Sequence, residues 1–199
     1  MTRCLIALTL LLALIGPSAA LAQTETAGPT WMLGVNAGVD LPMGDFKDAY
    51  KSAFTIGGSA AYMFTDKYGL ELGLEWSKFD ASDDLMSALE EAAPGETVDA
   101  TFQFLPVTVD FVEYFPVTPR LVPYVKGGLG IYFETAELEV SGKKDRRTDN
   151  DFGFNLAGGV KIPIQKMVSI DAGVRFHNVM TEDQSTQYFT FTAGLGVAF

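Results

Sequence analysis

The residue of this chain most open to a catalytic interpretation is His177, the sole histidine in 199 residues. A histidine can serve as the general base for a serine nucleophile in acyl transfer when the two side chains lie within hydrogen-bond reach. Here Asn178 follows His177 where an adjacent serine would be required, and Ser169 lies eight residues away, about 26 Å along a strand at about 3.3 Å per residue. The sequence therefore predicts no enzyme, and His177 is expected to be a polar filler near the rim of the fold.

A second set of reactive side chains consists of charges on the polar side of alternating segments. The acidic members are Glu71, Glu75, Asp110 and Asp171, and the basic members are Lys126, Lys161 and Arg175. Buried charges must be paired, and this set is nearly balanced in sign. We therefore expect a structural network of ion pairs in an enclosed interior. The alternative is a scatter of solvated surface charges, which is common on soluble proteins.

The elements that must position these charges are eight segments in which apolar residues recur at every second position. They are residues 31–40, 54–64, 68–79, 101–112, 121–134, 152–164, 168–178 and 188–199. This period of two predicts β-strands with one apolar face, and a length of about 10 residues suffices for a tilted strand to cross a bilayer. Pro106 indicates a bulge or irregular pairing in the fourth segment, where the alternation also blurs near Phe102 and Phe104.

Short and long connections alternate between the segments, which is typical of a membrane barrel with short periplasmic turns and long outer loops. The long loops are predicted at 41–53, 80–100, 135–151 and 179–187. The second is acidic, and Ser82 could cap a short helix within it. A calcium site is conceivable there, but the EF-hand spacing is missing, so a solvated loop is the better interpretation.

The polar side of the segments is rich in glycine, for example at Gly73, Gly128 and Gly194. A surface facing water has no need of such small residues, whereas the cramped interior of an eight-stranded barrel does. This observation favours apolar side chains that face lipid over a soluble barrel of the lipocalin type, in which they would point inward. The sequence thus predicts an all-β fold, an eight-stranded antiparallel up-and-down transmembrane barrel.

The first 22 residues have the features of a cleaved signal peptide. Arg3 precedes a short apolar stretch, and Ala20-Leu21-Ala22 supplies a small-x-small cleavage pattern. We therefore expect a signal peptide at 1–22 and a single barrel domain at 23–199. Cys4 is the only cysteine, so the mature chain would have no disulfide. The formal net charge of −11 argues against nucleic acid as a partner.

The chain resembles the small eight-stranded outer-membrane barrels, the OmpA-like transmembrane domain and its relatives in the outer membrane protein beta-barrel group. The residues that carry this resemblance are Leu41-Pro-Met-Gly-Asp-Phe46, Pro123 to Gly130 and the terminal Gly-Leu-Gly-Val-Ala-Phe199. It implies localisation in the cell outer membrane, contact with outer-membrane lipid, and insertion by the assembly machinery, which would read Phe199. Lipid A deacylases share this architecture, but the missing nucleophile argues against that activity.

The preferred hypothesis is a non-enzymatic barrel, with no cofactor and no metal, whose interior is filled by side chains with little or no open channel. Its role is expected to be structural in the envelope, or surface interaction through its loops, or both. It is expected to be a monomer or a weak oligomer. The basic residues Lys143, Lys144, Arg146 and Arg147 could contact lipopolysaccharide phosphates. The alternative function is a narrow OmpW-like pore for small or hydrophobic solutes, which the many glycines leave open; a soluble lipocalin-like carrier is a further, weaker alternative.

Overall fold

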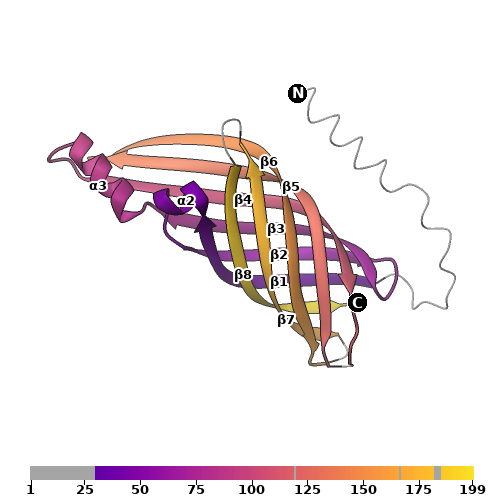
Figure 1. The fold of residues 1–199 in the computed structure, drawn as a ribbon. Coiled ribbons are helices and arrows are strands. Elements are labelled where there is room, and N and C mark those ends of the chain that lie inside the picture. The colour runs from indigo at the N-terminus through magenta and orange to yellow at the C-terminus, as the bar shows by residue number, and fades with distance from the viewer. Residues whose placement is uncertain (1–29, 119, 166, 182–184) are drawn as a thin grey trace, which may run out of the picture.

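The computed structural model describes residues 30–118, 120–165, 167–181 and 185–199, and these residues form one closed barrel (Figure 1). Its eight strands pair in chain order, each antiparallel to the next, and β1 closes on β8. The strands are β1 Thr30–Met43, β2 Ala53–Met63, β3 Tyr68–Asp80, β4 Val98–Tyr114, β5 Val122–Val140, β6 Lys143–Pro163, β7 Val168–Met180 and β8 Ser185–Ala198. The predicted fold class is confirmed. The predicted signal peptide at 1–22 lies outside the described residues.

The orientation of the strands follows the alternation of the sequence. Leu72 is 53% exposed and Ile170 is 41% exposed, while their neighbours on the other face, such as Glu71 at 5%, are buried. Apolar side chains thus cover the outside of the barrel, and polar, charged and glycine residues line the inside together with two clusters of buried aromatic and aliphatic side chains. A soluble barrel of the lipocalin type requires the reverse arrangement, so that alternative is excluded.

The register between β3 and β4 is the same on both sides of Pro106. Leu74 pairs with Val107 on one side and Ser77 with Phe104 on the other, with the pairing interrupted between them. No residue has been inserted, so Pro106 causes irregular pairing rather than a bulge, because it has no N–H to donate. The alternation also continues through Phe102 and Phe104, whose side chains lie inside the barrel.

The prediction of a long loop at 135–151 is wrong, because nearly all of it is strand. β5 runs to Val140 and β6 starts at Lys143, joined by a two-residue turn. Ser141 and Gly142 both have positive φ in that turn, of 48° and 78°, which is the conformation of a tight hairpin. The β6 half of the hairpin has no apolar alternation. On β5, Ala136, Leu138 and Val140 alternate with Glu137 and Glu139, but they lie on the inner face and not on the outer one, so they do not continue the pattern of the lipid-facing segments.

Together with β4, this hairpin extends the barrel wall beyond the other strands (Figure 1). β7 stops at Met180, opposite Phe152, and among the described residues, residues 143–149 of β6 pair with β5 alone. We call the three-stranded extension the arm; it comprises residues 98–100 of β4, 134–140 of β5 and 143–149 of β6. The short connections that follow β2, β4 and β6 leave from the opposite end of the barrel.

Two helices follow β1 and β3 at the same end as the arm. α3 Asp83–Ala92 confirms the predicted helix, and the Ser82 hydroxyl accepts a hydrogen bond from the Leu85 N–H as its N-cap. α2 Gly44–Ala49 was not predicted, and it places Phe46 over the mouth of the barrel. Of the helices in the described residues, neither has the length and apolarity to cross a membrane.

Candidate functional site

Three layers of side chains fill the inside of the barrel, one above the other. Along the inner face of β4 they appear in order as Phe104, then Thr108 and Asp110, then Val112 and Tyr114. The first belongs to an aromatic plug, the middle pair to a charge cluster and the last pair to a lower apolar layer. The plug consists of Ala53, Phe79, Phe104, Tyr132, Val179 and Tyr188, and the lower layer of Met63, Val112, Tyr114 and Tyr124. The charge cluster therefore lies between two layers of buried aromatic and aliphatic side chains.

The charge cluster consists of five of the seven charged residues predicted from the sequence. Arg175 is its centre: its Nη1 donates to Asp110 Oδ2 at 3.0 Å, and its other guanidinium nitrogens lie 3.8 Å from Glu71 Oε1 and 4.0 Å from Glu75 Oε1. Lys126 Nζ donates to Glu71 Oε1 at 2.7 Å. A guanidinium suits this role because it offers five donors and keeps its charge when buried.

Neutral polar groups complete the hydrogen bonding of Asp110, which is 0% exposed. Asn155 Nδ2 donates to its Oδ1 at 2.7 Å, and the Thr108 hydroxyl donates to Oδ2 at 3.2 Å. Asn155 Oδ1 in turn accepts from Arg175 at 3.3 Å. A buried ion pair is stable only when its remaining lone pairs are satisfied in this way, so the two neutral residues are integral to the cluster.

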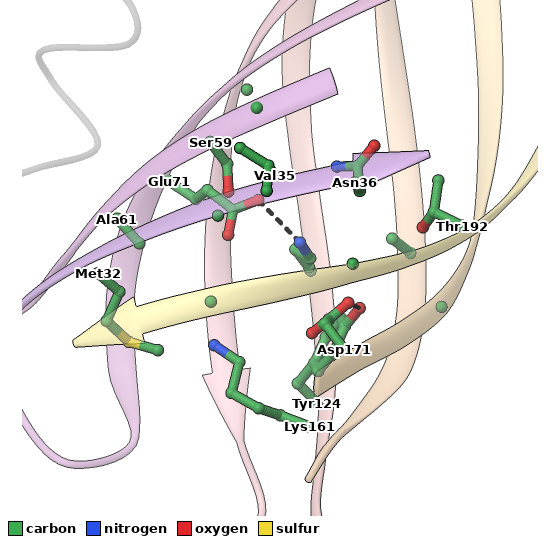
Figure 2. Close-up of a pocket in the computed structure, with 18 of the residues that line it drawn as sticks. Met32, Val35, Asn36, Ser59, Ala61, Glu71, Tyr124, Lys161, Asp171 and Thr192 are labelled. Atoms are coloured by element: carbon green, nitrogen blue, oxygen red, sulfur yellow. Dashed lines mark hydrogen bonds and ion pairs between the residues drawn. The ribbon is translucent and has the colours of Figure 1, made fainter. Parts of the chain in front are cut away.

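The other two predicted members, Lys161 and Asp171, contact tyrosines of the lower layer. Lys161 Nζ donates to the Tyr114 hydroxyl at 2.8 Å, and the Tyr124 hydroxyl donates to Asp171 Oδ1 at 2.9 Å. Glu71, Tyr124, Lys161 and Asp171 line a small pocket (Figure 2). Its volume is about 60 Å³, which accommodates only a few water molecules.

His177 does not lie near the rim, contrary to the prediction, but at the base of the aromatic plug. It is 0% exposed, and its ring stacks on that of Tyr188, with centroids 4.4 Å apart and planes inclined by 8°. Its Nδ1 shares a hydrogen bond of 2.9 Å with the Tyr132 hydroxyl, and its Nε2 lies 3.7 Å from Glu75 Oε2. β7 continues past His177 and carries Val179 into the plug, so the imidazole is covered from above.

The four basic residues of the predicted lipopolysaccharide contact lie on a strand and so divide between its two faces. Lys144 and Arg146 face outward beside Glu137 and Glu139 of β5, and Lys144 Nζ pairs with these carboxylates at 2.8 and 3.2 Å. Lys143 and Arg147 lie on the opposite face of the strand. All four are exposed, but the structure does not gather them into one cluster.

Phe199 closes the barrel through its backbone. Its N–H donates to the Trp31 carbonyl at 2.9 Å, and its carbonyl accepts from the Trp31 N–H at 3.0 Å. Its side chain contributes nothing to the interior, since the residue is 62% exposed on the outside. The aromatic ring is thus displayed on the surface next to the first strand.

Sequence reasoning missed the aromatic plug and the tyrosines of the lower layer. Phe102, Phe104 and Tyr132 occupy positions of the inner face that were expected to be polar or small. The blurred alternation of the fourth segment was the available signal, because it marks the place where both faces of β4 are apolar. The tyrosines gave no signal of their own.

Comparisons with known proteins agree with this geometry. Residues 8–199 match the family profile described as "Outer membrane protein beta-barrel domain". Among curated proteins, none matches the chain.

Several solved structures share the fold. Neisserial surface protein A is 18% identical, with a TM-score of 0.60 over 87% of this chain and 100% of its own. Ail, the attachment invasion locus protein of Yersinia pestis, crystallised with the heparin analogue sucrose octasulfate, is 14% identical, with a TM-score of 0.60 and the same coverage. OprG from Pseudomonas aeruginosa is 19% identical, with a TM-score of 0.52 over 89% of this chain and 98% of its own.

The family and these neighbours are outer-membrane proteins, which places the chain in the outer membrane with its apolar band in lipid. The arm and the two helices then lie at the extracellular end and the short turns in the periplasm, as in other barrels of this kind. The chain belongs to the family of outer membrane protein beta-barrel domains.

Proposed function

We propose that this protein is a plugged, non-enzymatic barrel that acts through its extracellular surface and does not conduct solutes. The observation that carries the proposal is the three-layered filling of the lumen. Phe79, Phe104, Tyr132 and Tyr188 of the plug are each 1% exposed or less, and Arg175 ties three carboxylates across the middle. An eight-stranded barrel has barely enough interior for its own side chains, so a lumen packed in this way supports a closed barrel.

The plug is reinforced from the outside by α2. The Phe46 ring contacts the rings of Tyr50, Phe79, Phe102 and Phe104, with centroid separations of 5.1 to 5.8 Å. Aromatic pairs at such distances contribute about 0.5–1.5 kcal/mol each beyond the burial of their surface. Movement of α2 away from the mouth of the barrel would break several of these aromatic contacts at once.

Single-channel recording in planar bilayers tests this proposal. Purified, refolded protein should produce no discrete openings, whereas a general porin inserted under the same conditions should conduct. Discrete openings of the wild-type barrel would refute the plugged state and favour the narrow pore. The observation on the side of the pore is the pocket beside Glu71 and Asp171, which is the one polar space recorded within the described lumen.

The arm supports the surface role, because it carries exposed charged residues beyond the membrane. The Ail structure contains a sulfated heparin analogue, and an anionic glycolipid offers phosphates of similar chemistry. We therefore propose lipopolysaccharide as a partner of Lys143, Lys144, Arg146 and Arg147.

Changing these four residues to glutamine should lower the amount of lipopolysaccharide that co-purifies with the barrel. Lys47→Gln is the control, since Lys47 is exposed on α2, outside the arm. An unchanged amount in the fourfold variant would exclude this partner.

A further inference from the structure

We propose that the arm is a self-recognition surface, through which two copies of this chain in facing membranes pair edge to edge. The inference rests on the proposed surface role and names its partner, a second copy of the chain. The starting observation is that residues 143–149 of β6 pair with β5 on one side and with no strand of the described residues on the other. Alternate N–H and C=O groups of this stretch are therefore available to another strand.

The charges on one face of this edge alternate in sign. Lys143, Asp145, Arg147 and Asp149 continue the lumen-facing side of β6, to which Asn155 also belongs. We call these four residues the inner row. Each of the four is exposed.

No member of the inner row has an opposite charge directly across from it on β5. Its cross-strand neighbours on β5 are Val140, Leu138, Ala136 and, opposite Asp149, the like-charged Glu134. Within residues 30–118, 120–165, 167–181 and 185–199, no ion pair is recorded for any member of the row. The outward face differs, because Glu137 and Glu139 there pair with Lys144.

A second copy of the same edge satisfies the row in one antiparallel register. With Arg146 opposite its own copy, Lys143 lies beside Asp149 of the other copy, and Asp145 beside its Arg147, so all four inner-row pairs are opposite in sign. A shift by two residues either way brings like charges together: Lys143 beside Arg147, or Asp145 beside Asp149. Opposite charges across strands stabilise pairing and like charges oppose it, so the sequence of the row selects the register. In the same register, Lys143 of one copy lies beside Asp149 of the other copy, next to which that copy's Glu134 carries a second negative charge.

The direction of the strands then determines how the two barrels face each other. In each copy, β6 runs from the extracellular tip toward its own membrane. Two antiparallel β6 edges therefore lead to membranes on opposite sides of the contact. Parallel pairing of the same two edges within one membrane would turn the inner face of one copy to the outer side of the other, so the two inner rows would not meet. The contact thus joins neighbouring cells or vesicles rather than barrels in one bilayer.

Clustering of phosphatidylcholine vesicles that contain the purified barrel tests the proposal in the absence of lipopolysaccharide. Light scattering should rise with time for the wild type, and raised salt should reverse the rise, because exposed charge pairs are screened. Many weak contacts between two surfaces add to a measurable effect. Wild-type vesicles that stay dispersed, or that cluster only when lipopolysaccharide is incorporated, would refute self-pairing.

Charge reversal supplies the matched variants. The pair Lys143→Asp and Arg147→Asp makes the row entirely acidic, and the pair Asp145→Lys and Asp149→Lys makes it entirely basic. Neither variant should cluster alone, and a mixture of the two vesicle populations should cluster. Clustering of either variant by itself would contradict the charge argument. Heat-modifiable migration on a gel checks that both barrels are folded.

A single cysteine tests the register, since Cys4 is the only native cysteine and precedes the predicted cleavage site. Arg146→Cys should form a disulfide-linked dimer in clustered vesicles, because this residue lies opposite its own copy. Thr148→Cys should not, because its copies would be offset by four residues, about 13 Å at about 3.3 Å per residue, beyond the reach of a disulfide. Equal cross-linking of both would refute this register. Bilayer recordings are unaffected by any of these outcomes, so failure of self-pairing leaves the plugged barrel standing.

Discussion

Removal of the central cation of the lumen, by Arg175→Met, should be among the most damaging single substitutions in this protein. The Arg175 side chain is 10% exposed and lies 3.0 Å from the Asp110 carboxylate, whose own side chain is 0% exposed. At that separation the Coulomb attraction is roughly 5 kcal/mol for an effective dielectric constant of about 20. Loss of one partner from a buried pair costs about 3–5 kcal/mol, because the remaining charge stays buried. Of the ion pairs recorded in the described residues, only those of Glu71 with Lys126 and of Glu75 with His177 would remain for these carboxylates, and Asp110 would have none.

The assay is urea unfolding of the barrel in lipid vesicles, followed by tryptophan fluorescence. Lys51→Met is the matched control, since Lys51 pairs with Asp83 at 2.7 Å with side chains 51% and 91% exposed. That surface pair is shorter than the buried one, yet we expect its loss to cost less than about 1 kcal/mol. The double variant Arg175→Met with Asp110→Leu should recover about 0.5–3 kcal/mol of the cost. A loss below about 1 kcal/mol for Arg175→Met, or equal losses for the two single variants, would refute the buried-network interpretation.

Three further predictions concern the wall, the arm and the terminus. Gly128→Ala should destabilise the barrel by about 1–3 kcal/mol, because a Cβ there would lie 2.7 Å from Asp110 Cα. Gly127→Ala, on the outer face, should cost less, because the atom nearest to an added Cβ is 3.1 Å away and ends the flexible Leu156 side chain. Urea unfolding that ranks the two alanine variants equally would contradict this prediction. In the arm, hydrogen bonding and the charge of Lys144 lower the pKa of Glu137. This pairing therefore stabilises the hairpin above the ordinary glutamate pKa, and the stabilisation is lost as the pH falls through the lowered value. Lys144→Met should raise the Glu137 pKa in an NMR titration, and an unchanged value would exclude the pairing. Phe199→Ala should leave unassisted folding into vesicles unchanged, since the exposed ring makes no interior contact. The same variant should reduce the amount of barrel inserted in the outer membrane of cells. Normal insertion in cells would show that Phe199 is not an assembly signal.

Much of the fold was predictable because one physical rule acts on every strand. A strand between lipid and a packed interior must alternate apolar with polar or small residues. The types of Leu72 and Glu71 therefore predict that they lie on opposite faces, without knowledge of the other strands. The same rule explains the failure in the arm. Beyond the membrane the outer face of the β5–β6 hairpin does not meet lipid, so the outward apolar period stops although the backbone pairing continues. Ala136, Leu138 and Val140 alternate on the inner face, and residues 143–151 show no apolar period.

The candidate site was predictable in composition and not in detail. Burial of both charge signs made ion pairing necessary, and this necessity could be read from Glu71, Asp110 and Arg175 alone. Which carboxylate meets which cation depends on register and barrel closure, since Arg175 and Asp110 are 65 residues apart in the chain. Alternation likewise assigns an inner position to Phe104 without indicating that it meets the rings of Phe46 and Tyr188.

The sequence by itself therefore determined the strands, their facing and the need for a paired interior, because these depend on local periodicity and on the cost of burying charge. The tertiary structure alone decided the partners of each charge, the closure of the lumen by rings from separate strands, and the free edge of the arm. These features arise where strands distant in the chain are brought side by side, or where one ends before its neighbour, as β7 does at Met180. The local periodicity of the sequence does not predict where a strand ends relative to its neighbour.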